Sequence, residues 1–410
     1  MRRYESYKDS GVEWLGEVPS HWELGRISTY FTERRTKVSD KDYPALSVTK
    51  LGVFPQWENV AKTNDGDNRK LAKKGDFVIN SRSDRKGSSG IAKQDGSVSL
   101  INIVLQPKKI NSVYSEYLFK SYSFIEEFYR VGHGIVADLW TTRFEDIKNS
   151  LIIFPPLSEQ QKIAQFLDDK IAKIDQAVDL AEKQIALLKE HKQILIQNAV
   201  TRGLNPDVPL KDSGVEWIGQ VPEHWEVKKL KFVLTLSNKK EESKNSNKRY
   251  IGMENIESFT GKINDIPLIA EGIANSFYKD EILFGKLRPY LAKSYLADFD
   301  GICSTEFLVY RSTKVLNNRF ALNIFLSYGF IDAVNASTYG SKMPRANAEF
   351  ISYMFLAIPP LSEQKQIIDY LDKQTAKIDQ AIALKTAHIE KLKEYKSVLI
   401  NDVVTGKVRV

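Results

Sequence analysis

The stretch PPLSEQQKIAQFLDDKIAKIDQA, residues 155–177, returns as PPLSEQKQIIDYLDKQTAKIDQA at residues 359–381. Two opening blocks return at the same shift of 203 or 204 residues: DSGVEW (9–14 and 212–217) and VPSHWE, later VPEHWE (18–23 and 221–226). The segments between these blocks have diverged almost beyond alignment. The chain is therefore two copies of one unit. A repeated frame with two different inserts suggests one architecture that presents two different recognition surfaces.

Length and composition are those of an ordinary globular protein. The 410 residues suit two or three domains, and 42% hydrophobic residues are enough for real cores. Lys and Arg exceed Asp and Glu by 59 to 52, a formal charge of +7 that favours an anionic partner. Cys303 is the single cysteine, which excludes an internal disulfide and fits a reducing compartment. Because no apolar run reaches the roughly 20 residues of a membrane span and the start MRRYESYKDS lacks a signal peptide's apolar core, we expect a cytoplasmic protein.

Each copy divides into three parts. The opening blocks, 7–27 and 210–230, are rich in Gly, Pro and Trp and should anchor tryptophans in a core. The middle parts mix short β-like runs with helical stretches, which is an α+β pattern. The predicted strands include 77–80, 99–105, 281–284 and 306–310, and the predicted helical stretches include 115–129 and 319–333. The predicted domains are 1–153 and 205–357, each globular with its opening block, and 154–204 and 358–410, each a long helix.

The third part of each copy is a long stretch without Gly or Pro in which apolar residues recur with 4,3 spacing. A stripe held over more than four heptads predicts coiled-coil helices, each of which needs a partner for its apolar face. Ser158 and Ser362 are predicted as N-cap residues. The stripe is broken by Lys192 in the first helix and by Thr375, Lys385 and Lys396 in the second. The predicted seam residues are Leu167, Ile171, Ile174, Val178, Ile185, Leu188, Leu195, Leu371, Ile378, Ile382, Ile389, Leu392, Leu399 and Val403.

The repeat also predicts the direction of the two helices. If a pseudo-two-fold axis relates the copies, the helices run antiparallel and Val410 lies close to the first opening block. A helix of ~40 residues that rises ~1.5 Å per residue is ~60 Å long. The expected fold class is therefore α+β, with two globular domains related by a pseudo-two-fold and separated by two long antiparallel coiled-coil helices.

The motifs of common catalytic sites are missing. The sequence has no GxxxxGK[ST] phosphate loop, no GxSxG elbow, no glycine-rich dinucleotide loop and no amino-methyltransferase motif. The five histidines form no metal-ligand cluster with Cys303. His21 and His224 are equivalent in the repeat and stand next to tryptophans, so we expect them to be structural. The chain is therefore expected not to be catalytic alone, and to hold neither a metal nor a cofactor.

Basic loops with small residues stand at matching places in the two middle parts. SRSDRKGSSG (81–90) and FGKLRPYLAK (284–293) each follow a predicted strand, while GHGIVADLWTTRF (132–144) and YGSKMPRANAEF (339–350) precede the long helices. Such side chains can bind phosphates and offer donors to base edges. Solvated loops with scattered lysines remain the alternative. The candidate DNA-binding residues are Ser81, Arg82, Ser83, Arg85, Lys86, Arg143, Lys286, Arg288, Tyr290, Ser341, Lys342, Arg345 and Asn347.

With its doubled VPxHWE and PPLSEQ blocks, the latter followed by AKIDQA, the chain resembles the DNA-specificity subunit of type I restriction-modification systems over essentially its whole length. The resemblance implies two target-recognition domains, each reading one half of a bipartite, asymmetric target in double-stranded DNA, with the helices as spacer. It also implies that the helices dock two methyltransferase subunits and that restriction and translocation subunits join the full complex. S-adenosylmethionine, ATP and Mg²⁺ would then be cofactors of those partners.

Two other functions remain open on the sequence alone. A nuclease or methyltransferase in its own right would act on DNA when supplied with Mg²⁺ or S-adenosylmethionine, whereas a specificity subunit by itself would not. A structural coiled-coil adaptor without a DNA role would lose no DNA affinity in its complex when the basic loops are removed.

Overall fold

The structure is a computed structural model that describes residues 2–56, 66–134, 140–269 and 271–410. The chain folds into two compact units, unit 1 with residues 1–181 and 387–410 and unit 2 with residues 182–386. Each unit therefore contains one opening block, one middle part and a portion of both long helices. The helices, which the sequence assigns to domains of their own, are shared between the units.

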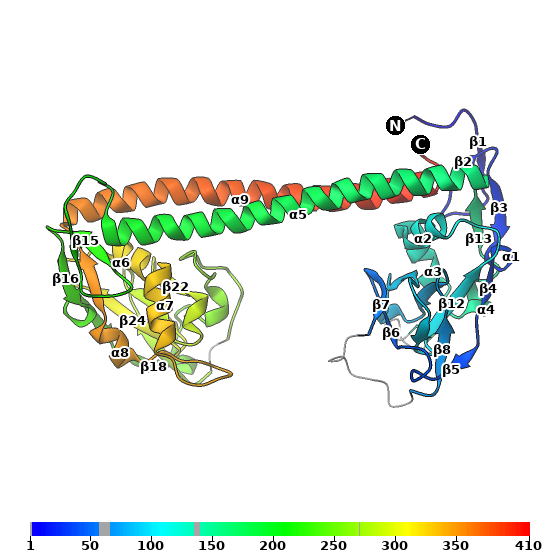
Figure 1. Cartoon of the computed structure of the whole chain (residues 1–410). Coiled ribbons are helices and arrows are strands. Elements are labelled where there is room, and N and C mark those ends of the chain that lie inside the picture. The colour runs from blue at the N-terminus through cyan, green and yellow to red at the C-terminus, as the bar shows by residue number, and fades with distance from the viewer. Residues whose placement is uncertain (1, 57–65, 135–139, 270) are drawn as a thin grey trace. The chain divides into compact units, whose positions relative to one another are not determined.

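Unit 1 begins with short strands and ends its middle part at the first long helix (Figure 1). Its elements up to that helix are β1 (Tyr7–Asp9), β2 (Glu17–Pro19), β3 (Glu23–Arg26), α1 (Ile27–Tyr30), β4 (Phe31–Glu33), β5 (Lys37–Val38), β6 (Leu46–Thr49), β7 (Gly52–Pro55), β8 (Arg69–Ala72), β9 (Phe77–Asn80), the 3₁₀ turn η1 (Ser83–Arg85), β10 (Ser89–Ile91), β11 (Gly96–Val98), β12 (Asn102–Pro107), α2 (Ser112–Lys120), α3 (Tyr122–Arg130), α4 (Phe144–Ile147), β13 (Leu151–Phe154) and α5 (Leu157–Arg202).

Unit 2 follows a similar order of elements, with the single strand β19 where unit 1 has the hairpin β6–β7, and ends at the second long helix (Figure 1). Its elements are β14 (Leu210–Asp212), β15 (Gln220–Pro222), β16 (Glu226–Lys229), η3 (Leu230–Phe232), β17 (Leu234–Ser237), β18 (Lys240–Glu242), η4 (Ser243–Asn245), β19 (Tyr250–Ile251), η5 (Met253–Asn255), β20 (Ile273–Phe277), β21 (Ile282–Gly285), η6 (Pro289–Leu291), β22 (Ser294–Leu296), β23 (Gly301–Cys303), β24 (Phe307–Ser312), α6 (Asn318–Phe325), α7 (Tyr328–Ala336), α8 (Ala348–Tyr353), β25 (Phe355–Ile358) and α9 (Leu361–Val404).

The two middle parts share one topology although their sequences have diverged. The main antiparallel sheet has the order β10-β9-β12-β4 in unit 1 and β22-β21-β24-β17 in unit 2, which is the same order by position in the repeat. A second sheet shares three strands in equivalent order, β5-β8-β11 in unit 1 and β18-β20-β23 in unit 2, and unit 2 adds β19, which pairs parallel with β23. The predicted strands at 77–80 and 281–284 are confirmed as β9 and β21. The mixed α+β class predicted from the sequence is confirmed.

Each of the two predicted helical stretches is broken into two helices, so the prediction of a single run is wrong at Ser121 in unit 1 and at residues 326–327 in unit 2. Ser121 separates α2 from α3, and Leu326 and Ser327 separate α6 from α7. In both cases the serine hydroxyl donates a 2.7 Å hydrogen bond to the carbonyl three residues earlier. A serine that bonds locally to the backbone competes with the helical pattern, which explains why the helix stops there.

The PPLSEQ blocks begin the long helices differently from the prediction. The helices start at Leu157 and Leu361, directly after the prolines, so Ser158 and Ser362 lie inside the first turn and are not N-cap residues. The carbonyl of Pro156 instead accepts hydrogen bonds from the first turn, including one of 2.9 Å from the Gln160 peptide nitrogen. Because the peptide nitrogens of Glu159 and Gln160 already donate to a backbone carbonyl, they do not need the serine hydroxyl as a cap.

The glutamate of each PPLSEQ block holds the opening block in place. In unit 1 the Trp22 indole Nε1 donates to Glu159 Oε2 at 3.2 Å, and His21 Nε2 lies 2.9 Å from the same oxygen. Unit 2 repeats this with Trp225 and His224 against Glu363, at 3.0 and 2.8 Å. Trp22 and Trp225 are fully buried. A buried indole N–H needs an acceptor, so the repeated motifs form a structural lock and the histidines are part of it.

The glutamine of each block ties the long helix to the helical hairpin of the same unit. In unit 1 the Gln160 amide donates to the Pro155 carbonyl at 2.8 Å and accepts from the Asn111 peptide nitrogen at 2.9 Å. Gln364 of unit 2 makes the equivalent bonds to the Pro359 carbonyl and the Asn317 nitrogen, at 2.8 and 2.7 Å. Both glutamines are buried, so each hydrogen bond replaces one that water can no longer make.

In each unit α5 and α9 pack antiparallel. The core of unit 1 joins Leu167 near the start of α5 to Val403 near the end of α9, and the core of unit 2 joins Ile196 to Leu371. The predicted seam residues are buried (Leu167, Ile174, Leu371, Ile378, Ile389, Leu399 and Val403) or half-buried (Ile171, Val178, Ile185, Leu188, Leu195, Ile382 and Leu392). At the end of α5 the more buried position is Ile196, one residue beyond the predicted Leu195.

The three lysines that break the seam form ion pairs or hydrogen bonds between the helices, whereas Thr375 donates to the Leu371 carbonyl of its own helix. In unit 2, Lys192 Nζ lies 2.7 Å from Asp379 Oδ1, and Lys385 Nζ donates to Gln184 Oε1 at 2.6 Å. In unit 1, Lys396 Nζ lies 2.6 Å from Asp175 Oδ1. Lys396 is the repeat counterpart of Lys192, and Asp175 is that of Asp379. The aspartate of the AKIDQA motif therefore neutralises a lysine of the other helix in both copies. A polar pair in an apolar seam fixes the register of the helices.

The end of the chain pairs with its start inside unit 1. Arg409 forms a bridge to Arg2, with its peptide nitrogen donating to the Arg2 carbonyl at 2.9 Å. Val410 packs against the core that contains Trp22. The prediction that Val410 lies close to the first opening block is confirmed.

Candidate nucleic-acid interface

The two basic loops predicted in unit 1 lie side by side. Arg82, just after β9, forms a β-bridge with Thr141, just before α4. The Ser83 nitrogen donates to the Trp140 carbonyl at 2.9 Å, and the Thr142 nitrogen donates to the Ser81 carbonyl at 2.9 Å. We call these segments, 81–86 and 140–143, the paired loops of unit 1. Part of the predicted second loop, residues 135–139, lies outside the described residues.

Unit 2 pairs its two loops through the same main-chain pattern. Leu287 forms a β-bridge with Arg345, the Arg288 nitrogen donates to the Pro344 carbonyl at 2.8 Å, and the Ala346 nitrogen donates to the Lys286 carbonyl at 2.9 Å. These segments, 286–290 and 339–347, are the paired loops of unit 2. Two loops that the sequence could only identify separately thus form one surface in each unit, built by equivalent backbone bonds.

The side chains on this common backbone differ between the units. The bridge that contains Arg345 in unit 2 contains Thr141 in unit 1, and the position of Arg288 holds Ser83. Arg143 corresponds to Asn347, the residue before α8, because both precede the short helix that follows the loops. The two surfaces therefore place charge and hydrogen-bond donors differently on one frame.

The cations in the first loop of unit 1 are partly neutralised by carboxylates. Asp84, which sequence reasoning left out, lies 3.2 Å from Arg82 and 3.7 Å from Arg85, and Lys86 pairs with Glu126 at 2.6 Å. All these side chains are at least 40% exposed. Exposed ion pairs contribute only ~0–1 kcal/mol, so a phosphate can take the place of the carboxylate at little cost.

Arg143 differs from the cations of the first loop in having no carboxylate partner among the described residues. Its side chain is exposed. Its peptide nitrogen donates to Asp146 Oδ2 at 2.7 Å, which fixes the backbone from which the guanidinium projects. Ser81, by contrast, is buried, so its side chain is a poor candidate for direct contact.

In unit 2, Arg288 has an unusual backbone. It is exposed, it makes no ion pair within the described part of the chain, and its φ of +50° lies in the left-handed region. For a residue with a side chain this conformation is uncommon and is found most often at binding sites. Tyr290, two residues later, is 44% exposed. The loop therefore holds Arg288 outward at the expense of local strain.

The other predicted residues of unit 2 have different surroundings. The Arg345 guanidinium is held by Glu306, with an Nη2–Oε1 distance of 3.0 Å, and this hydrogen bond raises the pKa of Arg345. Asn347 caps α8 by accepting from the Glu349 nitrogen at 2.7 Å, which gives it a structural role. Ser341 and Lys342 are exposed, and Lys286 is half-buried. Glu306 was missed because nothing in its local sequence marks it as a partner of Arg345.

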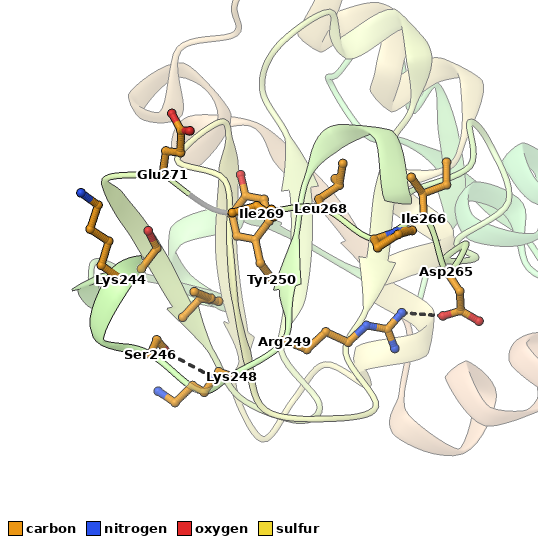
Figure 2. Close-up of a pocket in the computed structure, with 13 residues that line it drawn as sticks. Lys244, Ser246, Lys248, Arg249, Tyr250, Asp265, Ile266, Leu268, Ile269 and Glu271 are labelled. Carbon is orange, nitrogen blue, oxygen red and sulfur yellow. Dashed lines mark hydrogen bonds and ion pairs between the residues drawn. The ribbon is translucent and has the colours of Figure 1, made fainter.

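A second basic hollow in unit 2 lies outside the predicted loops. It has a volume of about 790 Å³ and is lined by Lys244, Lys248 and Arg249 together with apolar side chains (Figure 2). Figure 2 shows Arg249 turned toward Asp265. These two side chains lie 2.6 Å apart, and Lys248 pairs with Glu241 at 2.8 Å. The hollow lies outside the main-chain pairing of loops that the two units share, so it is not part of the surface compared above.

The described residues form neither a metal site nor an activated nucleophile. Among the residues that the structure describes, no three His, Cys, Asp or Glu side chains are grouped to hold a metal ion. Cys303 is fully buried in β23, and burial raises the pKa of its thiol to about 12, so it is not an activated nucleophile. Over the same described ranges, none of the helices has the length and apolar character needed to cross a membrane.

Comparison with known proteins agrees with the fold and the repeat. The family described as type I restriction modification DNA specificity domain matches residues 20–189 and 222–394. The chain is 24% identical to the putative type I restriction enzyme MjaX specificity subunit of Methanocaldococcus jannaschii, over 97% of this chain and 96% of that protein. It is 26% identical to the type I restriction enzyme EcoDI specificity subunit of Escherichia coli, over 57% of each chain.

Solved structures show the same fold at low sequence identity. A chain from a study of complex assembly and conformational transition of the type I R-M system superposes with a TM-score of 0.69 at 13% identity, covering 95% of this chain and 99% of that one. The HsdS subunit from Thermoanaerobacter tengcongensis superposes with a TM-score of 0.54 at 15% identity, covering 95% and 98%. The family match covers both copies of the repeat, so the chain belongs to the type I restriction-modification DNA specificity family, whose members are the non-catalytic DNA-recognition subunits of these systems.

Proposed function

We propose that the paired loops of each unit read one half of a bipartite, asymmetric target in double-stranded DNA. The observation that carries the proposal is the equivalent main-chain pairing of the loops in both units, Arg82 with Thr141 and Leu287 with Arg345, under unlike side chains. Because the main-chain bonds are equivalent, each pair of loops lies at the same place within its unit. Because the side chains differ, the two surfaces should prefer different bases. The two half-sites should therefore differ.

The chemistry of the loops suits base readout and phosphate binding together. Arg143 and Arg288 project without carboxylate partners among the described residues, so either can form two hydrogen bonds to a guanine edge. Arg82, Arg85 and Lys86 can exchange exposed carboxylates for phosphates. One bidentate contact to a base discriminates by about 1–3 kcal/mol, so the loss of one arginine should relax a single base position.

Sequencing of methylated bases in a host that carries this chain with its methyltransferase tests the proposal. Arg143→Gln should relax one half-site and Arg288→Gln the other, each leaving the opposite half unchanged. Lys109→Gln and Lys314→Gln are matched controls, because both lysines are exposed and lie between the main sheet and the helical hairpin of their units. An unchanged motif in both arginine variants would reject the paired loops as the site of readout.

We propose further that two methyltransferase subunits dock on this chain, one for each copy of the repeat. Exposed apolar residues recur at equivalent positions: Leu180 and Leu384, Ile194 and Val398, and Tyr122 and Tyr328, each between 50% and 65% exposed. In unit 2, Ile194 and Tyr328 line a mainly apolar hollow of about 920 Å³ together with Phe259 and Ile382. An exposed apolar set that occurs twice favours two copies of one partner.

Native mass spectrometry of the chain with its methyltransferase tests the docking. The unaltered complex should contain two methyltransferase subunits, Ile194→Glu or Val398→Glu should leave one, and the double variant should leave none. Leu187→Glu is the control, because Leu187 is even more exposed than Ile194, at 63% against 50%, but its repeat counterpart is Lys391. Loss of both subunits from a single variant would contradict two independent docking surfaces.

The larger assembly follows from the same proposal. Restriction and translocation subunits would join the complex, the partners would supply the binding sites for S-adenosylmethionine, ATP and Mg²⁺, and the complex would work in the cytoplasm. The purified chain should leave DNA unmodified when it is supplied with S-adenosylmethionine or Mg²⁺. Modification of DNA by the purified chain would contradict this assignment of the cofactors.

A further inference from the structure

Unit 2 carries a cluster of exposed aromatic side chains, each close to a lysine. Strand β16 pairs with β25 so that Lys229 lies opposite Phe355. Lys229 Nζ lies 5.2 Å from the ring centroid of Tyr353 and 5.5 Å from that of Phe355. Lys231 Nζ lies 3.9 Å from the centroid of Tyr353 and 5.4 Å from that of Phe232. We call these five residues the aromatic–lysine patch.

The patch is open to solvent, and its lysines have no carboxylate partner among the described residues. Phe232 is 64% exposed and Tyr353 is 48% exposed. Neither Lys229 nor Lys231 forms an ion pair with any residue of the described ranges, whereas the neighbouring Lys228 pairs with Glu226. Large aromatic rings that gather on a surface mark an interaction site. A cation over the face of each ring is held in place by the attraction between charge and ring, so the ammonium groups form an ordered positive array.

The first copy of the repeat lacks this array. At the positions of Lys231, Phe232 and Tyr353 unit 1 holds Ser28, Thr29 and Asn149. Arg26 and Leu151 take the places of Lys229 and Phe355. A partner that docks on both copies in the same way cannot use the patch. The ligand of the aromatic–lysine patch must therefore make a contact with unit 2 that it does not make with unit 1.

We propose that the aromatic–lysine patch binds the DNA backbone outside the half-site that unit 2 reads. The proposal rests on the placement of readout at the paired loops. Helix α8 begins directly after the loop residues Arg345 and Asn347 and ends at Tyr353. Its six residues span about 9 Å at 1.5 Å per residue. This is about three base pairs of B-DNA at ~3.4 Å per phosphate of one strand. Duplex DNA that passes the loops along α8 therefore presents its flanking phosphates to Lys229 and Lys231.

Charge complementarity favours DNA over a protein at this patch. Lysine is depleted in protein–protein interfaces, where aromatic residues are enriched but charges are few. Here both lysines occupy the ring faces that a protein partner would need to cover, which would remove the ammonium groups from water. Phosphates can bind without burying the ammonium groups, because they contact these groups at the edge of the patch.

Salt-dependent DNA binding by the complex of the full chain with its methyltransferase tests the inference. Two duplexes are compared, one with long flanks on both sides of the target and one that stops at the end of the half-site read by unit 2. For Lys229→Gln/Lys231→Gln, the slope of log affinity against log salt on the long duplex should become shallower by about 1.8, which is 0.9 for each lost phosphate contact. The short duplex should show no change.

Two further variants separate the roles of charge and ring. Tyr353→Leu keeps both lysines but removes the ring that holds them, so affinity for the long duplex should fall less than in the double lysine variant. Arg26→Gln, at the unit 1 position of Lys229, is the matched control and should not alter the flank dependence. The methylated motif should stay the same in all of these variants, which separates this inference from the readout by the paired loops.

Three results would overturn the inference. An unchanged slope on the long duplex would mean that the lysines touch no phosphate. An equal loss on both duplexes would place the contact inside the half-site. Unchanged DNA binding with weakened association of the methyltransferase would show that the patch is a protein-docking surface.

Discussion

Replacing Asp379 with alanine tests whether the ion pairs in the helical seam depend on burial. The Lys192 side chain is 11% exposed and would lose its 2.7 Å partner, while the position left by Asp379, itself 32% exposed, admits some water. Breaking a buried pair costs about 3–5 kcal/mol, and partial access of water lowers the expected loss here to about 2–3 kcal/mol. Lys192→Met removes the charge together with the need for a partner, so its effect should stay within about 1 kcal/mol.

The repeat supplies the control for this experiment. Lys396 and Asp175 form the equivalent pair in unit 1, but their side chains are 32% and 56% exposed, so Asp175→Ala should cost only about 0.2–1 kcal/mol. Hydrogen exchange by mass spectrometry on peptides from α5 and α9 measures the local free energy of opening. Amides near Lys192 should exchange roughly 30-fold faster or more in Asp379→Ala. If Lys192→Met or Asp175→Ala accelerates exchange as much as Asp379→Ala does, burial of an unpaired charge is not the cause.

Two further predictions concern unit 2. Glu363→Ala leaves the buried Trp225 indole N–H without its acceptor and should lower stability by about 1–3 kcal/mol, whereas Glu363→Gln keeps an acceptor and should lose less, as thermal unfolding can measure. Burial raises the pKa of Cys303 to about 12, so the stability gained by keeping this thiol neutral is complete below about pH 9 and is lost as pH rises toward 12. Cys303→Ala should therefore lose less stability than the unaltered chain in alkaline guanidinium unfolding, and equal losses would contradict the role of the thiol.

Much of the fold could be predicted because the frame residues keep their identities in both copies. Trp22 and Trp225 recur with Glu159 and Glu363 because a buried indole and its acceptor must change together. The helical seam is visible as a period of hydrophobicity, which depends only on neighbours along one helix. The break at Ser121 was not predictable in the same way. A serine can lie within a continuous helix or end it by bonding to the local backbone, and tertiary packing decides which of the two occurs.

The candidate site was predictable only in part. The loops were found as separate basic segments, but their pairing was not, because bonds such as Ser83 N to the Trp140 carbonyl involve main-chain atoms and leave no pattern of side chains. Sequence reasoning also treated Arg345 as a free cation, and the structure gives it Glu306, thirty-nine residues earlier in the chain, as a partner. Charge counted along the sequence overstates the charge that a folded surface offers to a ligand.

The main-chain bonds of the paired loops also affect how such a protein can change over time. A bridge between two backbones can form under unlike side chains, as Thr141 and Arg345 at one position show. Substitutions at exposed positions of these loops can then accumulate at little cost in folding stability, and a middle part from another relative could be inserted between the repeated blocks. New sequence preferences would arise by exchange and drift within a frame that selection keeps constant.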